Sequence, residues 1–507
     1  MTDSIPGTSL HGNAAPRKTP GSVPCMRRPL RVALVNPPFL PDFSRGQRSP
    51  AVTRSGTLYY PMWLAYAAAH AMRLGHEVEL IDAIAIGRTH DDTISRLQAF
   101  APHLILVEAS TPSIENDLAF AARAKAECGS TSVFMCGTHV SARPEESLAL
   151  QPSIDGALIG EYEIPMEEIL NAIAECRPVV GGEGVYLPGK PVKPRVRYFA
   201  DLDARPFVSE VYQRFLPISR YFNPNAHHPM VSILSGRGCP YRCTFCVFPQ
   251  TLTGHGYRRR SVESLIEEFK WISEHMPQVR GVFIEDDTFT ADRKRVSEFT
   301  KTLCGLRLPL TWTVNARADV DLETLRAMKA AGLRGVCVGF ESGCQELLNR
   351  IHKGTKIDEM ERFATDACTA GIKVHGCFMV GLPGETRISL QQTLQFAVRL
   401  PLDSAQFYPL MVYPGTEAFD WAKENGMLTA ERWRDWLSPE GLHQCVVRSA
   451  DLTSAQLVSF CNHARRKFYL RRSYLSGLAW RILIDPEERH RVFRSAKTFL
   501  RHLVLDK

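Results

Sequence analysis

The chain carries the stretch Ser235-Gly236-Arg237-Gly238-Cys239-Pro240-Tyr241-Arg242-Cys243-Thr244-Phe245-Cys246, a C-x3-C-x2-C pattern directly after the apolar residues 231–234. A compact loop lets three thiolates converge on one metal centre, and Gly236, Gly238 and Pro240 supply turn chemistry. Iron–sulfur clusters usually take four cysteines. Three cysteines this close together, with no evident fourth cysteine ligand, indicate a cubane cluster in which one iron has no protein ligand.

Two other interpretations fit three neighbouring cysteines: a zinc site or buried core thiols. Zinc favours paired C-x2-C knuckles with a second pair downstream, and the sequence shows no second pair. The triplet also follows a predicted strand, and the aromatic Phe245 precedes its last cysteine. We therefore favour the cluster.

This motif resembles that of the radical S-adenosylmethionine (radical SAM) superfamily. The resemblance implies that Cys239, Cys243 and Cys246 hold a [4Fe-4S] cluster and that SAM chelates its open iron. Reduction then cleaves SAM to a 5′-deoxyadenosyl radical. A reductase, flavodoxin or ferredoxin is implied as the electron donor.

Length and composition favour a large soluble protein. At 507 residues the chain can hold two or three domains with ample cores. Residues 1–28 read as a disordered leader without a signal-peptide core, and no run of about 18 apolar residues appears. We expect a cytoplasmic protein whose 14 cysteines are mostly free thiols.

The net charge of +7 belongs to the end of the chain, because residues 465–507 hold twelve Lys/Arg and four Asp/Glu. Within residues 430–507, a basic helical region, apolar side chains at 475, 478, 479, 482 and 483 keep a helical spacing. One interpretation is peripheral contact with an anionic inner membrane surface. The other is an ordinary helix on the barrel with solvated charges.

Residues 29–190 alternate apolar strands with amphipathic helices. This pattern predicts an α/β, doubly wound, Rossmann-like parallel sheet. Ligands of such sheets bind at the carboxyl ends of the strands. The predicted strands are 32–35, 78–81, 104–107, 133–135 and 156–159, with helices at 62–74 and 114–126.

The loops at those strand ends include Asn36-Pro37-Pro38, Gly137-Thr138-His139 and Gly160-Glu161. With these motifs the domain resembles the cobalamin-binding domain of cobalamin-dependent radical SAM enzymes. No G-x-G-x-x-G follows the first strand, which argues against a dinucleotide. The histidine motif D-x-H-x-x-G is also missing there, which implies base-off cobalamin with no histidine on cobalt; His139 is then a loop hydrogen-bonding residue. The implied cobalamin residues are Asn36, Pro37, Pro38, Ser110, Thr111, Gly137, His139, Gly160 and Glu161.

A second alternating series fills residues 229–429, after a Pro- and Arg-rich linker at 191–228. Its six βα units predict a partial (β/α)6 TIM barrel, whose chemistry gathers at the carboxyl ends of the strands. The predicted strands are 231–234, 281–284, 310–314, 335–340, 373–380 and 405–410, and the helices include 262–275, 322–331 and 357–370.

Resemblance to the radical SAM core assigns SAM contacts at these strand ends. Asp286 and Asp287 stand where the family's Gly-Gly-Glu motif meets the ammonium of SAM, and a carboxylate suits that cation. Residues 251–260 either reach an anionic substrate or form a solvated loop. The other implied contacts are Phe245 and Gly381 to adenine, Arg317 to the carboxylate and Glu341 to ribose.

The motifs around Cys246, Gly254 and Asp286 look closest to the branch that contains hopanoid-biosynthesis enzymes. That resemblance favours C-methylation of an unactivated carbon in a lipid or secondary metabolite. The alternative is radical rearrangement or ring contraction of a hopanoid-type lipid. Either way, the partner is a small-molecule or lipid substrate.

Two further classes are disfavoured. A tRNA-modifying methylthiolating enzyme would carry a second cysteine triad, whereas the first domain offers only Cys128 and Cys136; nucleic acid is therefore not the expected partner. A corrinoid carrier or sensor would need no cysteine triplet.

Overall fold

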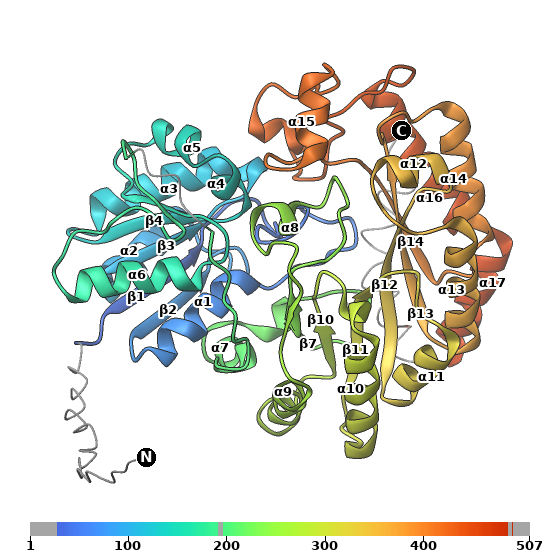
Figure 1. The fold of residues 1–507 in the computed structure, drawn as a ribbon, viewed down its shortest axis with the longest axis horizontal. Helices are drawn as coiled ribbons and strands as arrows, with labels where there is room; N and C mark the ends of the chain where they lie inside the picture. The colour runs from blue at the N-terminus through green and yellow to red at the C-terminus, as the bar shows by residue number, and fades with distance from the viewer. Residues whose placement is uncertain (1–27, 191–195, 485–488, 490–507) are drawn as a thin grey trace, which may run out of the picture.

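The computed structural model describes residues 28–190, 196–484 and 489, so most of the predicted leader and the end of the basic tail lie outside the described residues. Two α/β domains stand side by side, the first in blue to teal and the second from green to red (Figure 1). Each is built on a six-stranded sheet. The predicted fold class is confirmed.

The first sheet has the strand order β2-β1-β3-β4-β5-β6. Its first five strands are parallel, and the short β6 is antiparallel to β5. The order reverses between β1 and β3, which is where ligands of such sheets bind. The strands are β1 (Arg31–Asn36), β2 (Glu77–Asp82), β3 (Leu104–Glu108), β4 (Ser132–Cys136), β5 (Gly156–Leu158) and β6 (Val185–Tyr186).

Both faces of this sheet are covered. Residues of β1 alternate, with Leu34 in the cluster that includes α1 (Met62–Arg73) and Val35 in the opposite cluster with α3 (Ile114–Glu127). The remaining helices are α2 (His90–Phe100), the 3₁₀ turn η1 (Thr111–Ser113), α4 (Thr138–Ala142), α5 (Pro144–Leu150) and α6 (Glu163–Ala174).

The predicted linker at 191–228 is not irregular throughout. It contains α7 (Val208–Phe215) and the 3₁₀ turn η2 (Ile218–Arg220). Val208, Val211 and Tyr212 are fully buried, and α7 packs on α1. A single two-turn helix gives too little periodicity to stand out among the surrounding prolines and arginines.

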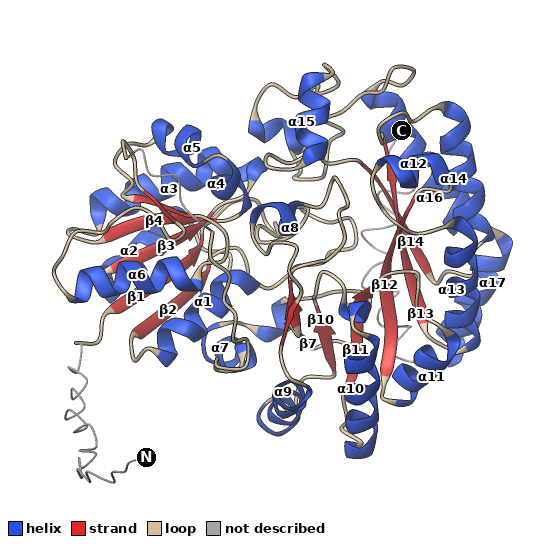
Figure 2. Ribbon diagram, in the orientation of Figure 1, coloured by secondary structure: helices blue, strands red, loops and turns tan. Residues whose placement is uncertain are grey.

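The second sheet is entirely parallel, in the order β14-β13-β12-β11-β10-β7, with its helices outside (Figure 2). Its strands are β7 (Met230–Ile233), β10 (Gly281–Ile284), β11 (Thr311–Ala316), β12 (Leu333–Glu341), β13 (Lys373–Val380) and β14 (Ser404–Pro409), and a small ribbon joins β8 (Gly236–Arg237) to β9 (Arg258–Arg259). Its helices are α8 (Val247–Thr251), α9 (Val262–His275), η3 (Phe289–Ala291), α10 (Arg293–Leu306), α11 (Leu322–Ala330), α12 (Gln345–Arg350), α13 (Ile357–Thr369) and α14 (Arg387–Arg399).

The C-terminal region packs on the barrel. It comprises α15 (Glu417–Glu424), η4 (Trp433–Trp436), α16 (Ser454–Tyr469) and α17 (Arg472–Ile484). Tyr469 at the end of α16 accepts a hydrogen bond from the Ala405 amide at 3.0 Å and donates one to its carbonyl at 2.9 Å. Among the described helices, none is long and apolar enough to cross a membrane. Membrane contact by the tail stays a prediction.

Candidate active site

Cys239, Cys243 and Cys246 line one cavity at the carboxyl ends of the barrel strands, about 1130 Å³ including its mouth. We call it the cofactor cavity. Within the described residues, no three His, Cys, Asp or Glu side chains are grouped around a single metal position. A cubane needs only that each thiolate reach a different iron, so three sulfurs facing one cavity fit the cluster.

The cysteine loop is held by its own backbone contacts. Gly238 has φ +82°, and a Cβ there would lie 2.2 Å from the carbonyl oxygen of Gly256, so only glycine fits. The Nδ1 of His255 lies 3.1 Å and 3.0 Å from the carbonyl oxygens of Cys239 and Tyr241. His255 therefore supports the cluster loop.

The three arginines of residues 251–260 are used structurally. Arg260 forms a buried ion pair with Glu268. Arg259 pairs with Asp292 at 2.9 Å, and Arg258 pairs with Glu161 of the first domain. The three arginines are thus held by carboxylates, and Arg258 and Arg260 are largely buried, so the segment is not simply a solvated loop. Contact with an anionic substrate stays a prediction.

The two neighbouring aspartates after β10 have different surroundings. Asp286 is fully buried and accepts hydrogen bonds from the Ser235 amide at 2.7 Å, the Ser235 hydroxyl at 2.5 Å and the Gly236 amide at 3.0 Å. Asp287 lines the cofactor cavity, which Asp286 does not. Of the two predicted acids, Asp287 is therefore placed to meet a ligand ammonium, and Asp286 anchors the loop before the cysteines.

Asp287 is held by a residue that sequence reasoning missed. Arg48, in the loop after β1 of the first domain, donates to Asp287 Oδ1 from Nη2 at 3.0 Å and from Nε at 3.2 Å. It also donates to the Glu285 carbonyl at 3.1 Å, and its guanidinium lies 4.9 Å from the Phe248 ring. Figure 1 shows the blue loop crossing to the barrel beside α8. The first domain thus contributes to the cavity wall.

Arg317 and Glu341, for which the resemblance implies SAM contacts, line the same cavity. Arg317 stacks over Tyr241 at 3.6 Å and donates to the Lys353 carbonyl at 2.6 Å. The Lys353 ammonium, also in the cavity wall, lies 2.8 Å from Glu341 Oε1. Lys353 follows α12 in a loop without periodicity, so nothing in the sequence marked it.

Of the two predicted adenine contacts, Phe245 lines the cofactor cavity and Gly381 does not. A Cβ at Gly381, which has φ +85°, would lie 3.1 Å from side chains of Val447 and Leu457. Gly381 therefore packs against the C-terminal region.

The predicted cobalamin residues gather at the carboxyl edge of the first sheet but line no part of the cofactor cavity. Arg45 donates to the Asn36 side chain and to the Pro37 carbonyl, the latter at 2.9 Å. Asn116 donates to the Pro38 carbonyl at 2.9 Å. The side chain of Asn36 is thus used inside the domain.

The loops after β3 and β4 meet at this edge. Thr111 Oγ1 lies 3.1 Å from His139 Nδ1, and the His139 ring lies 5.0 Å from the Trp433 ring of η4. Ser110 is fully buried beside them. A Cβ at Gly137 would lie 2.1 Å from the Ala109 carbonyl oxygen, so glycine allows the two loops their close approach.

Glu161 belongs to the domain interface. It pairs with Arg258 at 2.7 Å and lies 3.4 Å from Arg237, which is two residues before Cys239. Glu163 pairs with Arg237 and Arg205, each at 2.8 Å. Gly160 precedes this cluster.

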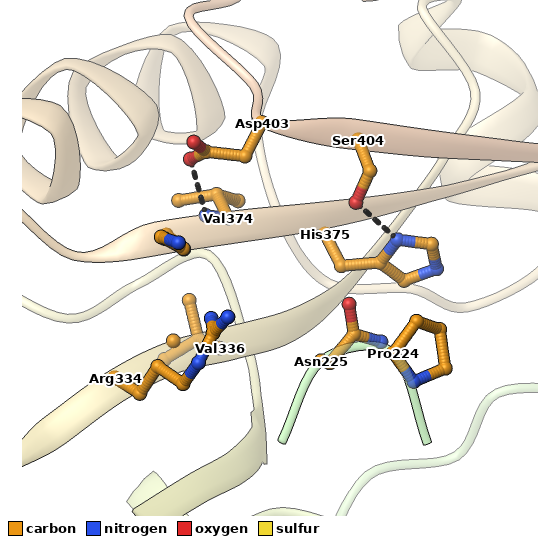
Figure 3. Close-up of a pocket in the computed structure, with 10 residues that line it drawn as sticks. Pro224, Asn225, Arg334, Val336, Val374, His375, Asp403 and Ser404 are labelled. Atoms are coloured by element: carbon orange, nitrogen blue, oxygen red, sulfur yellow. Dashed lines mark hydrogen bonds between the residues drawn. The ribbon is translucent and has the colours of Figure 1, made fainter. Parts of the chain in front are cut away.

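A separate pocket lies at the amino-terminal ends of β12, β13 and β14 (Figure 3). Asp403 there accepts a hydrogen bond from the Val374 amide at 3.0 Å, and Ser404 lies 2.8 Å from His375. Chemistry in barrels of this kind gathers at the opposite end, so we assign no cofactor to this pocket.

Comparison with known proteins accounts for both halves of this arrangement. Residues 233–397 match the Radical SAM superfamily model, and residues 48–170 match the B12 binding domain model. The chain is a radical SAM enzyme with a B12-binding domain. It is 29% identical to an uncharacterized methyltransferase of Pyrococcus horikoshii, over 82% of this chain and 89% of the relative.

Two further similarities set the limits of the assignment. The structure of the radical SAM methyltransferase TsrM from Kitasatospora setae, with cobalamin and a [4Fe-4S] cluster, superposes with a TM-score of 0.67 at 18% identity, covering 93% of this chain and 99% of TsrM. This shows a common fold. The hopanoid C-3 methylase of Methylococcus capsulatus is 25% identical over 74% of this chain and 70% of the relative. That likeness is too distant to confirm the predicted hopanoid branch.

The donor sets fit the three cofactors of this radical SAM enzyme. Three thiolates suit the [4Fe-4S] cluster, and Asp287 and Arg317 offer opposite charges to the amino acid part of SAM. At the cobalamin edge, Glu108 Oε2 at the end of β3 is buried without a hydrogen-bond partner among the described residues. An amide of the corrin side chains could satisfy that acceptor.

Proposed function

We propose that the enzyme transfers a methyl group to an unactivated carbon of a small-molecule substrate. The observation that carries the proposal is Arg48, because through it the B12-binding domain forms part of the cavity that holds the three cysteines. Bound cluster and SAM supply a carbon-centred radical, and methylcobalamin supplies the methyl group. The methyltransferase relative supports this choice over rearrangement.

The chain's own residues position SAM. Asp287, held by Arg48, accepts from the SAM ammonium, and Arg317 donates to its carboxylate. Glu341 is kept in place by Lys353 and accepts from the ribose hydroxyls. Phe245 covers the adenine. These groups would hold SAM in the cavity that the three cysteines line.

The test is reconstitution under anaerobic conditions with iron, sulfide and cobalamin, with reduced flavodoxin or ferredoxin as the proposed electron donor, and with a metabolite extract of a gene-deletion strain as the source of substrate. We expect 5′-deoxyadenosine from SAM, and a deuteromethyl group from labelled SAM in the product. If product forms but carries no label, the enzyme catalyses a radical rearrangement and not a methylation.

We further propose that cobalamin binds base-off with no histidine on cobalt. Burial lowers the pKa of His139 to about 3, and its ring is engaged by Thr111 and Trp433. In the electron paramagnetic resonance (EPR) spectrum of the cob(II)alamin form, we expect no splitting from an axial nitrogen. Such splitting, lost in His139→Ala, would overturn this assignment.

A further inference from the structure

A second, larger chamber lies inside the barrel next to the cofactor cavity, about 1750 Å³ including its mouth. We call it the inner chamber. Its walls come from the barrel strands, from the loop after β1 and from the C-terminal region. Representative wall residues are Thr57, Tyr59, Asn225, Glu285, Gln406 and Tyr469.

The inner chamber and the cofactor cavity share part of their walls: Arg48, Ser49, Asn315, Cys337, Cys377 and Tyr408 line both. A molecule in the inner chamber would therefore lie next to the cofactor cavity. A substrate carbon has to approach the radical and the methyl donor together. Both the loop after β1, which belongs to the first domain, and the barrel form walls of this chamber, so it lies where the two domains meet.

Glu285 is the chamber's buried carboxylate. It is 3% exposed, its Oε2 accepts from Asn315 at 3.4 Å, and the nearest guanidinium nitrogen of Arg48 lies 3.7 Å away. Its Oε1 is buried with no hydrogen-bond partner among the described residues. An unsatisfied buried acceptor is costly, so a ligand that donates a hydrogen bond there is favoured.

The charged groups around Glu285 do not fully compensate its carboxylate. Arg48 faces both Asp287 and Glu285, so one cation serves two carboxylates. His443, on the same wall, lies 2.9 Å from the Ser49 hydroxyl, and burial lowers its pKa to about 4, so it brings no positive charge at neutral pH. Burial raises the pKa of Glu285 to about 7, as expected for an acid lacking full compensation.

We propose that the inner chamber binds a polar, water-soluble substrate that donates a hydrogen bond from an N–H or O–H group to Oε1 of Glu285. Amide and hydroxyl side chains such as Gln47, Thr57 and Asn225 supply further polar contacts. A wholly hydrocarbon ring system would leave Oε1 of Glu285 unpaired. This inference rests on the proposed methylation, which explains why a substrate chamber adjoins the cofactor cavity.

The first test separates the two proposals. A host strain and its gene deletion are fed deuteromethyl-methionine, and aqueous and chloroform extracts are compared. We expect the metabolite that the deletion lacks to lie in the aqueous phase and to carry the label. If the metabolite that the deletion lacks is labelled in the parent strain but lies in the chloroform phase, the proposal of a polar substrate is overturned and methylation is retained. A missing aqueous metabolite without label supports the chamber and overturns methylation. No missing metabolite in either phase overturns both.

The second test addresses Glu285 directly, by complementing the deletion with variants. Glu285→Leu removes the acceptor and should abolish product, whereas Glu285→Gln keeps a carbonyl acceptor and should lower the product roughly tenfold, the effect of one hydrogen bond to a charged group. Glu298→Gln, exposed on α10, is the matched control. Iron content of each purified variant checks folding. A wild-type amount of product from the Glu285→Leu variant would overturn the proposal. If that variant does not fold, a wild-type amount of product from Glu285→Gln overturns it instead.

Discussion

Arg48 of the B12-binding domain lies 3.0 Å from the Asp287 carboxylate of the radical SAM barrel, 239 residues later in the chain. Thr253 donates to the second oxygen of Asp287 at 3.3 Å, so both oxygens are anchored. The carboxylate expected to meet the SAM ammonium is thus oriented by two segments, one from each domain.

Arg48→Ala should weaken SAM binding roughly tenfold, because it removes a charge-assisted contact that orients Asp287. Arg48→Lys should recover part of the loss, since an ammonium keeps the charge but not the two-nitrogen contact. The Michaelis constant for SAM and the change in the cluster EPR spectrum on adding SAM report this effect. The control is Arg214→Ala on α7, which is exposed. An unchanged Michaelis constant and EPR response in Arg48→Ala would mean that Arg48 has no positioning role.

Each of Cys239→Ala, Cys243→Ala and Cys246→Ala should lose the cluster and all SAM cleavage, because each thiolate is expected to bind a different iron. Cys304→Ala, on an exposed cysteine of α10, is the control and should retain both. Iron and sulfide content and 5′-deoxyadenosine formation are the measurements. Wild-type cleavage in all three variants would refute the cluster assignment.

Arg237→Ala should destabilise the protein by about 3 kcal/mol, which is the usual effect of removing one partner of a buried ion pair and leaving the other charge uncompensated. Arg237 is 2% exposed and bridges Glu161 and Glu163 across the domain interface. The midpoint of thermal unfolding should fall by several degrees, whereas Arg326→Ala on the exposed face of α11 should not change it. Equal midpoints for both variants would show that the interface does not depend on this pair.

Glu108→Gln should make the protein more stable at pH 8 but not at pH 5. Burial raises the pKa of Glu108 to about 7, from an ordinary value of 4.5. The folded protein therefore binds this proton more tightly than the unfolded chain does, so wild-type stability falls as the pH rises through that window. Thermal unfolding of the variant, with exposed Glu115→Gln as control, should show a smaller decline. If the stability of Glu108→Gln falls with rising pH as much as that of the wild type, Glu108 is not the cause of the fall.

Strong local patterns made the fold predictable. Alternating apolar strands and helices are visible in the sequence, and five of the six predicted barrel strands begin within one residue of the observed ones. The exception is β12, which begins two residues before its prediction. The cysteine motif was equally visible because its three ligands lie in one short loop.

Side-chain direction was not predictable from position alone. Asp286 and Asp287 are adjacent, yet only Asp287 lines the cofactor cavity, because successive residues of an extended segment point to opposite sides. Arg48 and Lys353 lie in loops without periodicity, and the partner of Arg48 is 239 residues away in the chain. Gly381 was predicted to contact adenine from its position after β13, yet it does not line the cofactor cavity and lies beside Val447 and Leu457 of the C-terminal region.

The contact from Arg48 to Asp287 bears on how such two-domain enzymes can exchange parts during evolution. A barrel joined to a first domain that lacks an arginine at the position of Arg48 would keep its cysteines but lose the residue that orients its aspartate. Recombination at the segment between the domains should therefore yield functional hybrids when the loop at residues 37–61, or one with an equivalent arginine, accompanies the barrel. The two domains are then inherited as a matched pair.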